Sequence, residues 1–109
     1  LQAGAREEAL AAAREAHGLA PQDAAVLDTL GWILAQDGQF EEALKYLRDA
    51  VTRQSSDAEI RFHLAYVLDK LGRRKEALAE LDSALAGARP FQARAEAEAL
   101  RAGLAGAGR

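Results

Sequence analysis

The sequence contains no cysteine, no methionine and only two prolines. Without cysteine, disulfide bonds and thiolate metal sites are excluded. No apolar run approaches the ~20 residues of a membrane-spanning helix, and the N-terminal segment lacks the basic and apolar regions of a signal peptide. The chain begins at Leu1 rather than at methionine, so we expect a piece of a longer protein, and the sequence leaves the compartment open.

The chain also has no excess of basic residues. It carries 14 lysines and arginines against 17 aspartates and glutamates, which gives a formal net charge of −3. The only basic run, Arg73 to Lys75, is too short for the basic stripe that nucleic-acid binding requires, and we interpret it as a solvated turn. We therefore expect no nucleic-acid partner and no contact between this chain and a membrane.

Signals for catalysis and for metal binding are missing as well. His17 and His63 are far apart in the sequence and have no cysteine near them, whereas zinc needs about four converging ligands. The sequence has no nucleophile elbow, no phosphate-binding glycine loop and no acidic calcium loop. We expect no enzyme, no metal and no cofactor, so any catalysis would reside elsewhere in a larger parent protein.

What the sequence does contain is an internal repeat of 34 residues. Shifting the sequence against itself by this period aligns five columns that are identical in three copies: Gly4, Gly38 and Gly72; Glu8, Glu42 and Glu76; Ala9, Ala43 and Ala77; Leu10, Leu44 and Leu78; and Ala16, Ala50 and Ala84. A fixed period of this length indicates stacked units, each too small to bury its own apolar face.

Each unit is predicted to be a hairpin of two helices. Apolar residues such as Leu27, Leu30 and Leu34 recur at helical spacing. An aspartate precedes each first helix as an N-cap, and a glycine allows a turn with positive φ before the second helix. These residues are Asp23, Asp57, Gly38 and Gly72.

Small residues predict that the paired helices approach closely. Much of the hydrophobic half of the chain is alanine, and aromatic residues make up only 6%, so we expect a thin core. Gly31 should face Ala43 and Ala50 within one unit, and Ala65 should take the same place in the next. The helix axes should then lie near the lower end of the ~8–10 Å range.

The register also predicts how the chain is divided. Residues 1–22 form the second half of a truncated repeat, with residues 1–3 as a helical stub, a turn at Gly4 and a helix over 5–18. Residues 23–56 and 57–90 are full repeats, 91–104 a capping helix and 105–109 a frayed tail.

The pattern Leu30-Gly31…Gly38…Ala43…Ala50, repeated as Leu64-Ala65…Gly72…Ala77…Ala84, resembles the tetratricopeptide repeat over nearly the whole chain. The resemblance implies an all-α fold, a short right-handed superhelix of helix-turn-helix repeats with a C-terminal capping helix. Leu27 and Arg61 stand where the family prefers tryptophan, and Ser55 stands where it usually has proline. We expect Ile60 to supply the apolar contact that Arg61 does not.

A narrower stretch suggests a source. The run Ile60-Arg61-Phe62-His63-Leu64-Ala65, followed later by Pro90-Phe91, resembles the C-terminal part of bacterial repeat lipoproteins associated with exosortase and exopolysaccharide export. That resemblance implies a bacterial parent that is periplasmic or membrane-anchored; otherwise we expect a cytoplasmic protein.

The family resemblance further implies a concave groove, lined by the first helix of each unit, that binds a peptide or a partner protein. Trp32, Phe62 and Tyr66 would form an aromatic strip in it, although Trp32 and Tyr66 could equally be core residues. The candidate groove residues are Asp28, Trp32, Gln36, Phe62, His63, Tyr66, Asp69, Lys70 and Glu96, with Ala35 and Leu100 on the same face.

The groove positions argue against one known use of this fold. Family members that bind acidic chaperone tails use lysine, arginine and asparagine there to hold a carboxylate. The matching positions in this sequence are Asp28, Trp32, His63, Ala93 and Ala97, so we do not expect chaperone-tail binding. Asp28 and His63 could be neighbours across adjacent units, where a surface hydrogen bond is the expected role.

The sequence also leaves a structural role open. A truncated array would leave the apolar face of its first complete helix, Leu10, Ala13 and Ala16, without a partner. About three repeats are needed to bury a continuous core, and this chain has about two and a half. The alternative to a binding scaffold is therefore a self-assembly element, in which two copies form a homodimer through exposed apolar helix faces.

Overall fold

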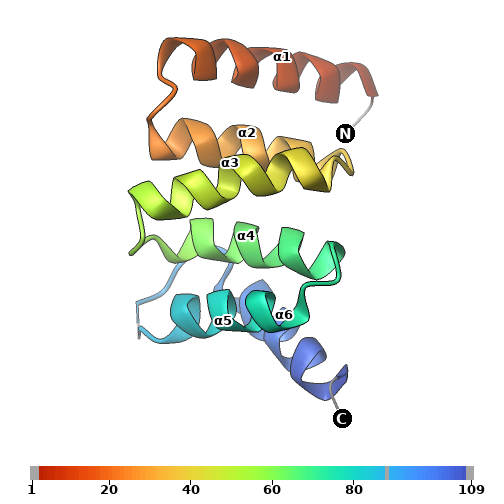
Figure 1. Cartoon of the computed structure of the whole chain (residues 1–109), viewed down its shortest axis with the longest axis vertical. Helices are drawn as coiled ribbons and strands as arrows, with labels where there is room; N and C mark the ends of the chain where they lie inside the picture. Colours follow the sequence, from red (N-terminus) through yellow and green to blue (C-terminus); the bar gives the residue numbers. More distant parts are fainter. Residues whose placement is uncertain (1–2, 88, 108–109) are drawn as a thin grey trace.

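The computed structural model describes residues 3–87 and 89–107, and over these residues it contains six α-helices and no strand (Figure 1). The all-α fold class predicted from the repeat is thus observed. None of these helices is long and apolar enough to cross a membrane. The helices are α1 (Ala3–Leu19), α2 (Ala24–Gln36), α3 (Phe40–Arg53), α4 (Ala58–Lys70), α5 (Arg74–Leu85) and α6 (Arg94–Ala107).

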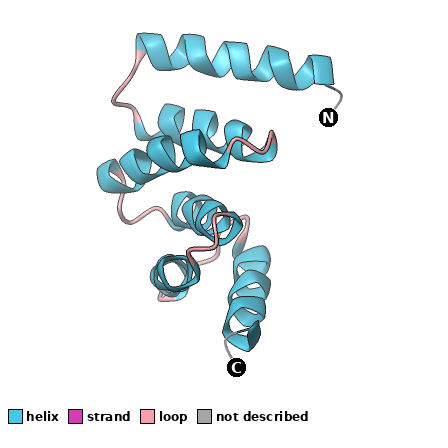
Figure 2. Cartoon of the chain, turned by 45° about the vertical axis from the view of Figure 1, so that its right-hand side comes forward, coloured by secondary structure: helices cyan, strands magenta, loops and turns pink. Residues whose placement is uncertain are grey.

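The helices stack in chain order along the long axis of the molecule, from α1 at one end to α5 and α6 at the other (Figure 1). Each helix packs on the next, and α4 also contacts both α2 and α6. Short loops join the stacked helices, and α6 runs beside α4 and α5 (Figure 2). The first helices of successive units, α2 and α4, therefore share one side of the molecule with α6.

The predicted caps and turns define the hairpins. Asp23 Oδ1 accepts hydrogen bonds from the backbone N–H groups of Ala25 and Val26, at 2.9 and 3.1 Å, and Asp57 plays the same part at the start of α4. Both satisfy donors that the first helical turn leaves free. Gly38 (φ 81°) and Gly72 (φ 77°) are the residues with positive φ within the described part of the chain, as predicted.

The core is thin, as the alanine content predicts. Its largest fully buried side chains are six leucines and a valine, and alanines with no exposed surface fill the space between the helices. Truncating one of these leucines to alanine should cost about 2–5 kcal/mol. The residues are Leu27, Leu30, Leu34, Leu47, Val67, Leu68 and Leu81, with Ala43, Ala50, Ala65 and Ala77. Ile60 is buried as expected, at 4% exposure.

Gly31 is the point where α2 and α3 come closest. A Cβ atom added there would lie 2.7 Å from Leu47 Cγ and 3.4 Å from the Ala43 carbonyl oxygen. Contact with Ala43 is as predicted, but Leu47 rather than Ala50 is the nearest side chain. Since real Cβ atoms essentially never approach within 3.0 Å of a neighbour, only glycine fits this crossing without a shift.

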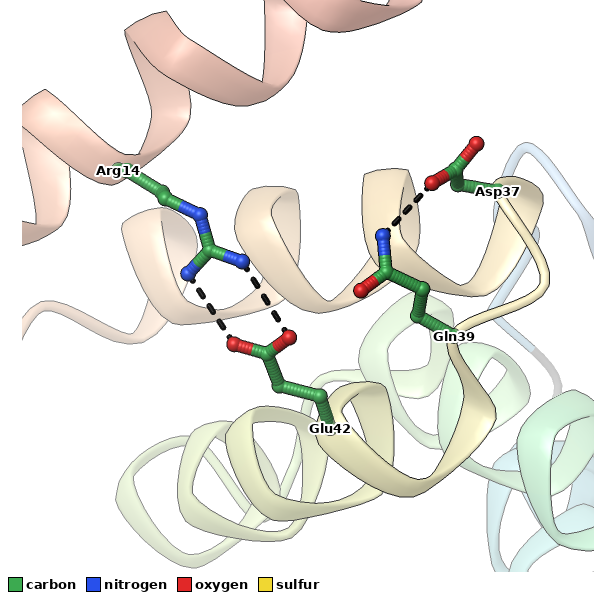
Figure 3. A network of polar contacts seen from close by, with 4 residues as sticks. All are labelled: Arg14, Asp37, Gln39 and Glu42. Atoms are coloured by element: carbon green, nitrogen blue, oxygen red, sulfur yellow. Dashed lines mark hydrogen bonds and ion pairs between the residues drawn. The ribbon is translucent and has the colours of Figure 1, made fainter.

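Ion pairs that recur with the 34-residue period join the second helices of successive units, α1, α3 and α5. Arg14 of α1 forms two hydrogen bonds with Glu42 of α3, at 3.1 and 3.2 Å (Figure 3). Arg48 of α3 repeats this contact with Glu76 of α5, at 2.8 Å. The two acids occupy the identical column noted above, so the period that aligns the sequence also aligns these bridges.

These bridges shift the pKa values of exposed groups. The hydrogen bond from Arg48 lowers the pKa of Glu76 below its ordinary value, and the hydrogen bond to Glu42 raises the pKa of Arg14. At the α2–α3 turn, the hydrogen bond from Gln39 (Figure 3) and then the one from Arg6 lower the pKa of Asp37. Because these groups are exposed, their contribution to stability is small.

The N-terminal predictions were wrong in two respects. First, α1 begins at Ala3 and continues through Gly4, so there is neither a stub nor a turn; Leu1 and Gln2 lie outside the described residues. Glycine is compatible with helix as well as with positive φ. Second, the apolar face is not unpartnered, because α1 packs on α2, and Ala13 is only 6% exposed within the core.

The C-terminal helix is also displaced from its prediction. It begins at Arg94 rather than Phe91, because the Phe91 carbonyl accepts a turn hydrogen bond from Arg94 N–H and Glu59 Oε1 accepts one from Ala93 N–H. It then continues to Ala107. The predicted frayed tail is therefore helical over 105–107, and residues 108–109 lie outside the described part.

Candidate peptide-binding groove

Four rings meet where α2 faces α4. The Trp32 indole stacks on the His63 imidazole, with centroids 4.1 Å apart and planes at 19°. Tyr66 meets the indole edge-on at 5.1 Å, and Phe62 lies tilted at 6.1 Å. The spacing of these three α4 residues places them on one helix face, so the fold brings together all the aromatic residues that the sequence predicted for the groove. We call Trp32, Phe62, His63 and Tyr66 the aromatic cluster.

A hydrogen bond between the two units holds the imidazole in place. His63 Nδ1 lies 2.7 Å from Asp28 Oδ1, and their side chains are 11% and 17% exposed. The predicted neighbourhood is confirmed, but the bond is largely buried rather than at the surface. In the neutral ring the carboxylate acceptor places the hydrogen on Nδ1. Asp28 precedes Trp32 by one helical turn, so the same face of α2 holds both partners of His63.

Beside the aromatic cluster lies a groove of about 380 Å³. It is formed by α2, α4, the segment before α6, and α6 itself. Five predicted residues line it: Trp32, Gln36, Phe62, His63 and Glu96. The other lining residues are Glu59, Gln92 and Ala93.

The remaining predicted residues lie beside this groove rather than in its wall. Asp28 lines a neighbouring hollow of about 210 Å³ between α2 and the start of α4. Tyr66 continues along α4, where the Lys70 ammonium group lies 5.3 Å from its ring centre. Asp69 is partly buried and Lys70 is exposed. Asp69 and Lys70 lie in the last turn of α4, whereas the groove is lined by residues of the first half of this helix, so neither residue lines the groove.

The residues predicted to form the aromatic strip differ in how much of their surface is exposed. Phe62 is only 4% exposed and Ala35 only 2%. Both belong to the core, and Phe62 lines the groove with the little surface that it exposes. Phe62 is buried in the same core cluster as Ala93 and Ala97, which α6 and the segment before it contribute. Trp32 and Tyr66 are partly buried and pack against the core, so each combines an anchored part with an accessible part.

Two groove residues were missed by the sequence reasoning. Glu59 lies in the first turn of α4, three residues before Phe62, and this spacing could have placed it on the same face. Gln92 was not predicted as a groove residue because the last helix was expected to begin at Phe91. In the structure Gln92 lies in the segment before α6 and lines the groove. No group of three or more metal-ligating side chains gathers within the described residues.

A larger hollow adjoins this groove and shares Glu59 with it. It measures about 550 Å³ and is bordered by the α3–α4 loop and the segment between α5 and α6. Its Arg61 is already bonded to Glu80 at 2.8 Å and to the Ser55 carbonyl at 2.7 Å. Its lining mixes serines and small residues with charged ones, and Phe91 is its only aromatic residue within the described chain, so it lacks the aromatic cluster that marks the groove.

Comparison with known proteins agrees with the helical-repeat fold. The sequence profile of the tetratricopeptide repeat matches residues 29–93, whereas no curated protein matches the chain. The structure is similar to that of PcrH, solved in complex with the chaperone binding region of PopD. The TM-score is 0.84 and the identity 25%, over 99% of this chain and 84% of that one.

A second similar structure is a thermophilic tetratricopeptide protein of Thermus thermophilus. It has a TM-score of 0.76 and 28% identity over 93% of this chain, which spans 50% of that protein. The fold is therefore an all-α superhelix of helical hairpins. From its repeat, its hairpins and the matched profile, the chain belongs to the tetratricopeptide repeat family.

Proposed function

We propose that this chain is a non-catalytic scaffold that binds a peptide, or an extended segment of a partner protein, in the groove between α2, α4 and α6. The observation that carries the proposal is the partly buried Trp32, whose indole is held by the aromatic cluster at the wall of a 380 Å³ groove. Membership of the family, and a similar structure solved with a bound partner region, support a protein-interaction scaffold.

The groove is suited to this role because its wall is already in place. His63 is fixed by Asp28, and the His63 ring supports the indole, so little ordering is required when a ligand binds. Partly exposed aromatic side chains contribute large contact areas at interfaces. Gln36 and Gln92 place amide groups along the lining, where they can hydrogen-bond the backbone of an extended peptide.

Affinity selection from a library of random twelve-residue peptides tests this proposal. We expect peptides selected on the wild-type chain to lose most of their binding to Trp32→Ala. Because truncating Trp32 also removes core contacts, Gln36→Arg serves as a second variant, in which a long side chain occupies the groove from an exposed position. Tyr46→Ala is the matched control, since Tyr46 packs on His17 away from the groove.

If folded Trp32→Ala and Gln36→Arg both bound the selected peptides as well as wild type, the peptides would bind elsewhere and the proposal would be wrong. Circular dichroism identifies the variants that are folded. Loss of binding in both variants, with retention in Tyr46→Ala, would support the groove.

Self-assembly remains a second candidate, and α1 supplies the observation that favours it. Ala9 and Ala16 are partly exposed, whereas Ala43 and Ala50, in the same repeat columns, have no exposed surface. An apolar hollow of about 200 Å³ lies between α1 and α2 beside this face, and Leu19 is 82% exposed. Light scattering at millimolar concentration tests the idea: a strict monomer would remove it, and a dimer disrupted by Ala16→Glu would support it.

The narrower resemblance at residues 60–65 and at Pro90-Phe91 adds a proposal about the partner. It would be a component of a bacterial exopolysaccharide export system, and the parent protein would be a lipoprotein. Deleting the parent gene in its own organism would then reduce exported polysaccharide. Unchanged export would argue against this assignment without affecting the groove.

A further inference from the structure

We propose that the groove selects cationic peptides, binding an arginine or lysine side chain between Glu59 and Glu96 with its aliphatic stem against Trp32. This inference rests on the proposed function and specifies its ligand class. It predicts the opposite charge preference from the acidic-tail binding described for the family.

The first argument is the charge of the groove. Among the residues that the structure describes, Glu59 and Glu96 are the only charged ones in its lining, and no lysine or arginine reaches it. Within residues 3–87 and 89–107, neither glutamate takes part in an ion pair. Two neighbouring hollows share Glu59. Among the described residues, the smaller adds Asp28 and Asp57 and no cation, whereas the larger contains Arg89 and Arg61, of which Arg61 is paired with Glu80. A groove lined by one sign of charge concentrates ligands of the opposite sign.

The second argument is that the arginines pair with groups outside the groove. In the described part of the chain, each acid that an arginine pairs with lies outside this groove: Asp37, Glu42, Asp49, Glu76, Glu80, Asp82 and Glu98. The two arginines nearest in sequence to the groove residues are also engaged elsewhere. Arg61 binds Glu80, and Arg94 donates to the carbonyls of Gly87 and Arg89 in the segment after α5. The groove acids are therefore left for an external cation.

The third argument is the shape of the cation that fits. Lysine and arginine carry a long apolar stem beneath a charged head. The indole of Trp32 and the methyl group of Ala93 offer an apolar wall, and tryptophan is the best aromatic partner for a cation. Arginine should be preferred over lysine, because its fork of N–H donors can serve a carboxylate and an amide oxygen together.

Both glutamates also have local roles, and these roles leave them able to bind. Glu59 Oε1 accepts from Ala93 N–H at 3.2 Å, which leaves its second oxygen for a ligand. Glu96 lies in the first turn of α6, where the helix dipole favours a negative charge, and it is exposed. Glutamine at either position keeps an acceptor oxygen and the side-chain shape, so the substitutions remove charge with little other change.

The test uses peptides selected from the random library on the wild-type chain. We expect enrichment of arginine and lysine over aspartate and glutamate. An enriched peptide should lose about tenfold in affinity when its arginine is replaced by citrulline, its neutral isostere. Glu59→Gln and Glu96→Gln should each weaken the arginine peptide and leave the citrulline peptide unchanged. Glu15→Gln, an equal loss of charge on an exposed α1 position, is the control.

Three results would overturn the inference. Selected peptides without a basic bias, equal affinity of the arginine and citrulline peptides, or equal weakening by Glu15→Gln would each show that the groove does not recognise a cation. In those cases the proposed function survives if binding still depends on Trp32 and Gln36. Peptides that are basic but bind independently of Trp32 and Gln36 would instead overturn both.

Discussion

At the residue scale, the candidate site depends on a chain of contacts from Asp28 to His63 to Trp32. The 2.7 Å hydrogen bond orients the imidazole, and the imidazole supports the indole at 4.1 Å. His63 is only 9% exposed, so its polar nitrogen needs the partner that Asp28 supplies. Removing one member should therefore affect both folding and the groove wall.

We predict that Asp28→Ala lowers the free energy of unfolding by about 1–3 kcal/mol, because it leaves a buried His63 nitrogen without its partner. Urea denaturation measures the change. In the double variant with His63→Ala, the two effects should be less than additive. Full additivity would mean that the hydrogen bond contributes nothing to folding.

Gly31 gives a second prediction at this scale. Gly31→Ala should destabilise the protein by about 1–3 kcal/mol, since the new methyl group overlaps Leu47. Gly103→Ala in α6 is the matched control, because a Cβ there meets nothing within 4 Å, and it should stabilise by up to about 1 kcal/mol through helix propensity. Equal effects in urea denaturation would contradict the close approach of α2 and α3.

At the scale of elements, α1, α3 and α5 are linked by ion pairs that repeat with the sequence. Arg14–Glu42 and Arg48–Glu76 join successive second helices, and Asp82 on α5 pairs with Arg101 on α6. In this last pair the charges are exchanged: α5 supplies the acid and α6 the arginine. In the two earlier pairs, α1 and α3 each supply the arginine and the next second helix supplies the acid.

The lowered pKa of Glu76 gives a prediction about pH. A carboxyl group with a folded pKa below its unfolded value contributes stability above the unfolded pKa, and loses it as pH falls through the folded pKa. Arg48→Gln should return the pKa of Glu76 toward its ordinary value of 4.5, as measured by NMR titration of its carboxyl group. The small stability difference from wild type should disappear in acid, and a difference that persists there would have another origin.

Local rules explain which elements could be predicted. Asp23 and Gly38 act within a few residues of themselves, so a cap and a turn could be assigned from sequence alone. Gly4 shares a column with Gly38 but takes helical backbone, because identity with a turn residue does not by itself create a turn. The start of α6 depends on Glu59, 34 residues before Ala93, so no nearby signal revealed that Gln92 belongs to the groove.

At the scale of the whole molecule, the repeat places equivalent helices side by side, and this arrangement creates the site. Trp32 and Tyr66 occupy the same place in successive units, so stacking α2 on α4 turns a sequence period into adjacent rings. The capping helix closes the groove and contributes Glu96. The groove therefore requires α2, α4, α6 and the segment before α6 together.

The most direct test of this account is acrylamide quenching of Trp32, the only tryptophan, with and without a peptide selected on the wild-type chain. We predict that free Trp32 is partly accessible to acrylamide, and that saturating peptide shifts its emission and reduces quenching. An indole whose emission and quenching are unchanged at saturating peptide would make Trp32 a core residue only, and would contradict a ligand groove between α2, α4 and α6.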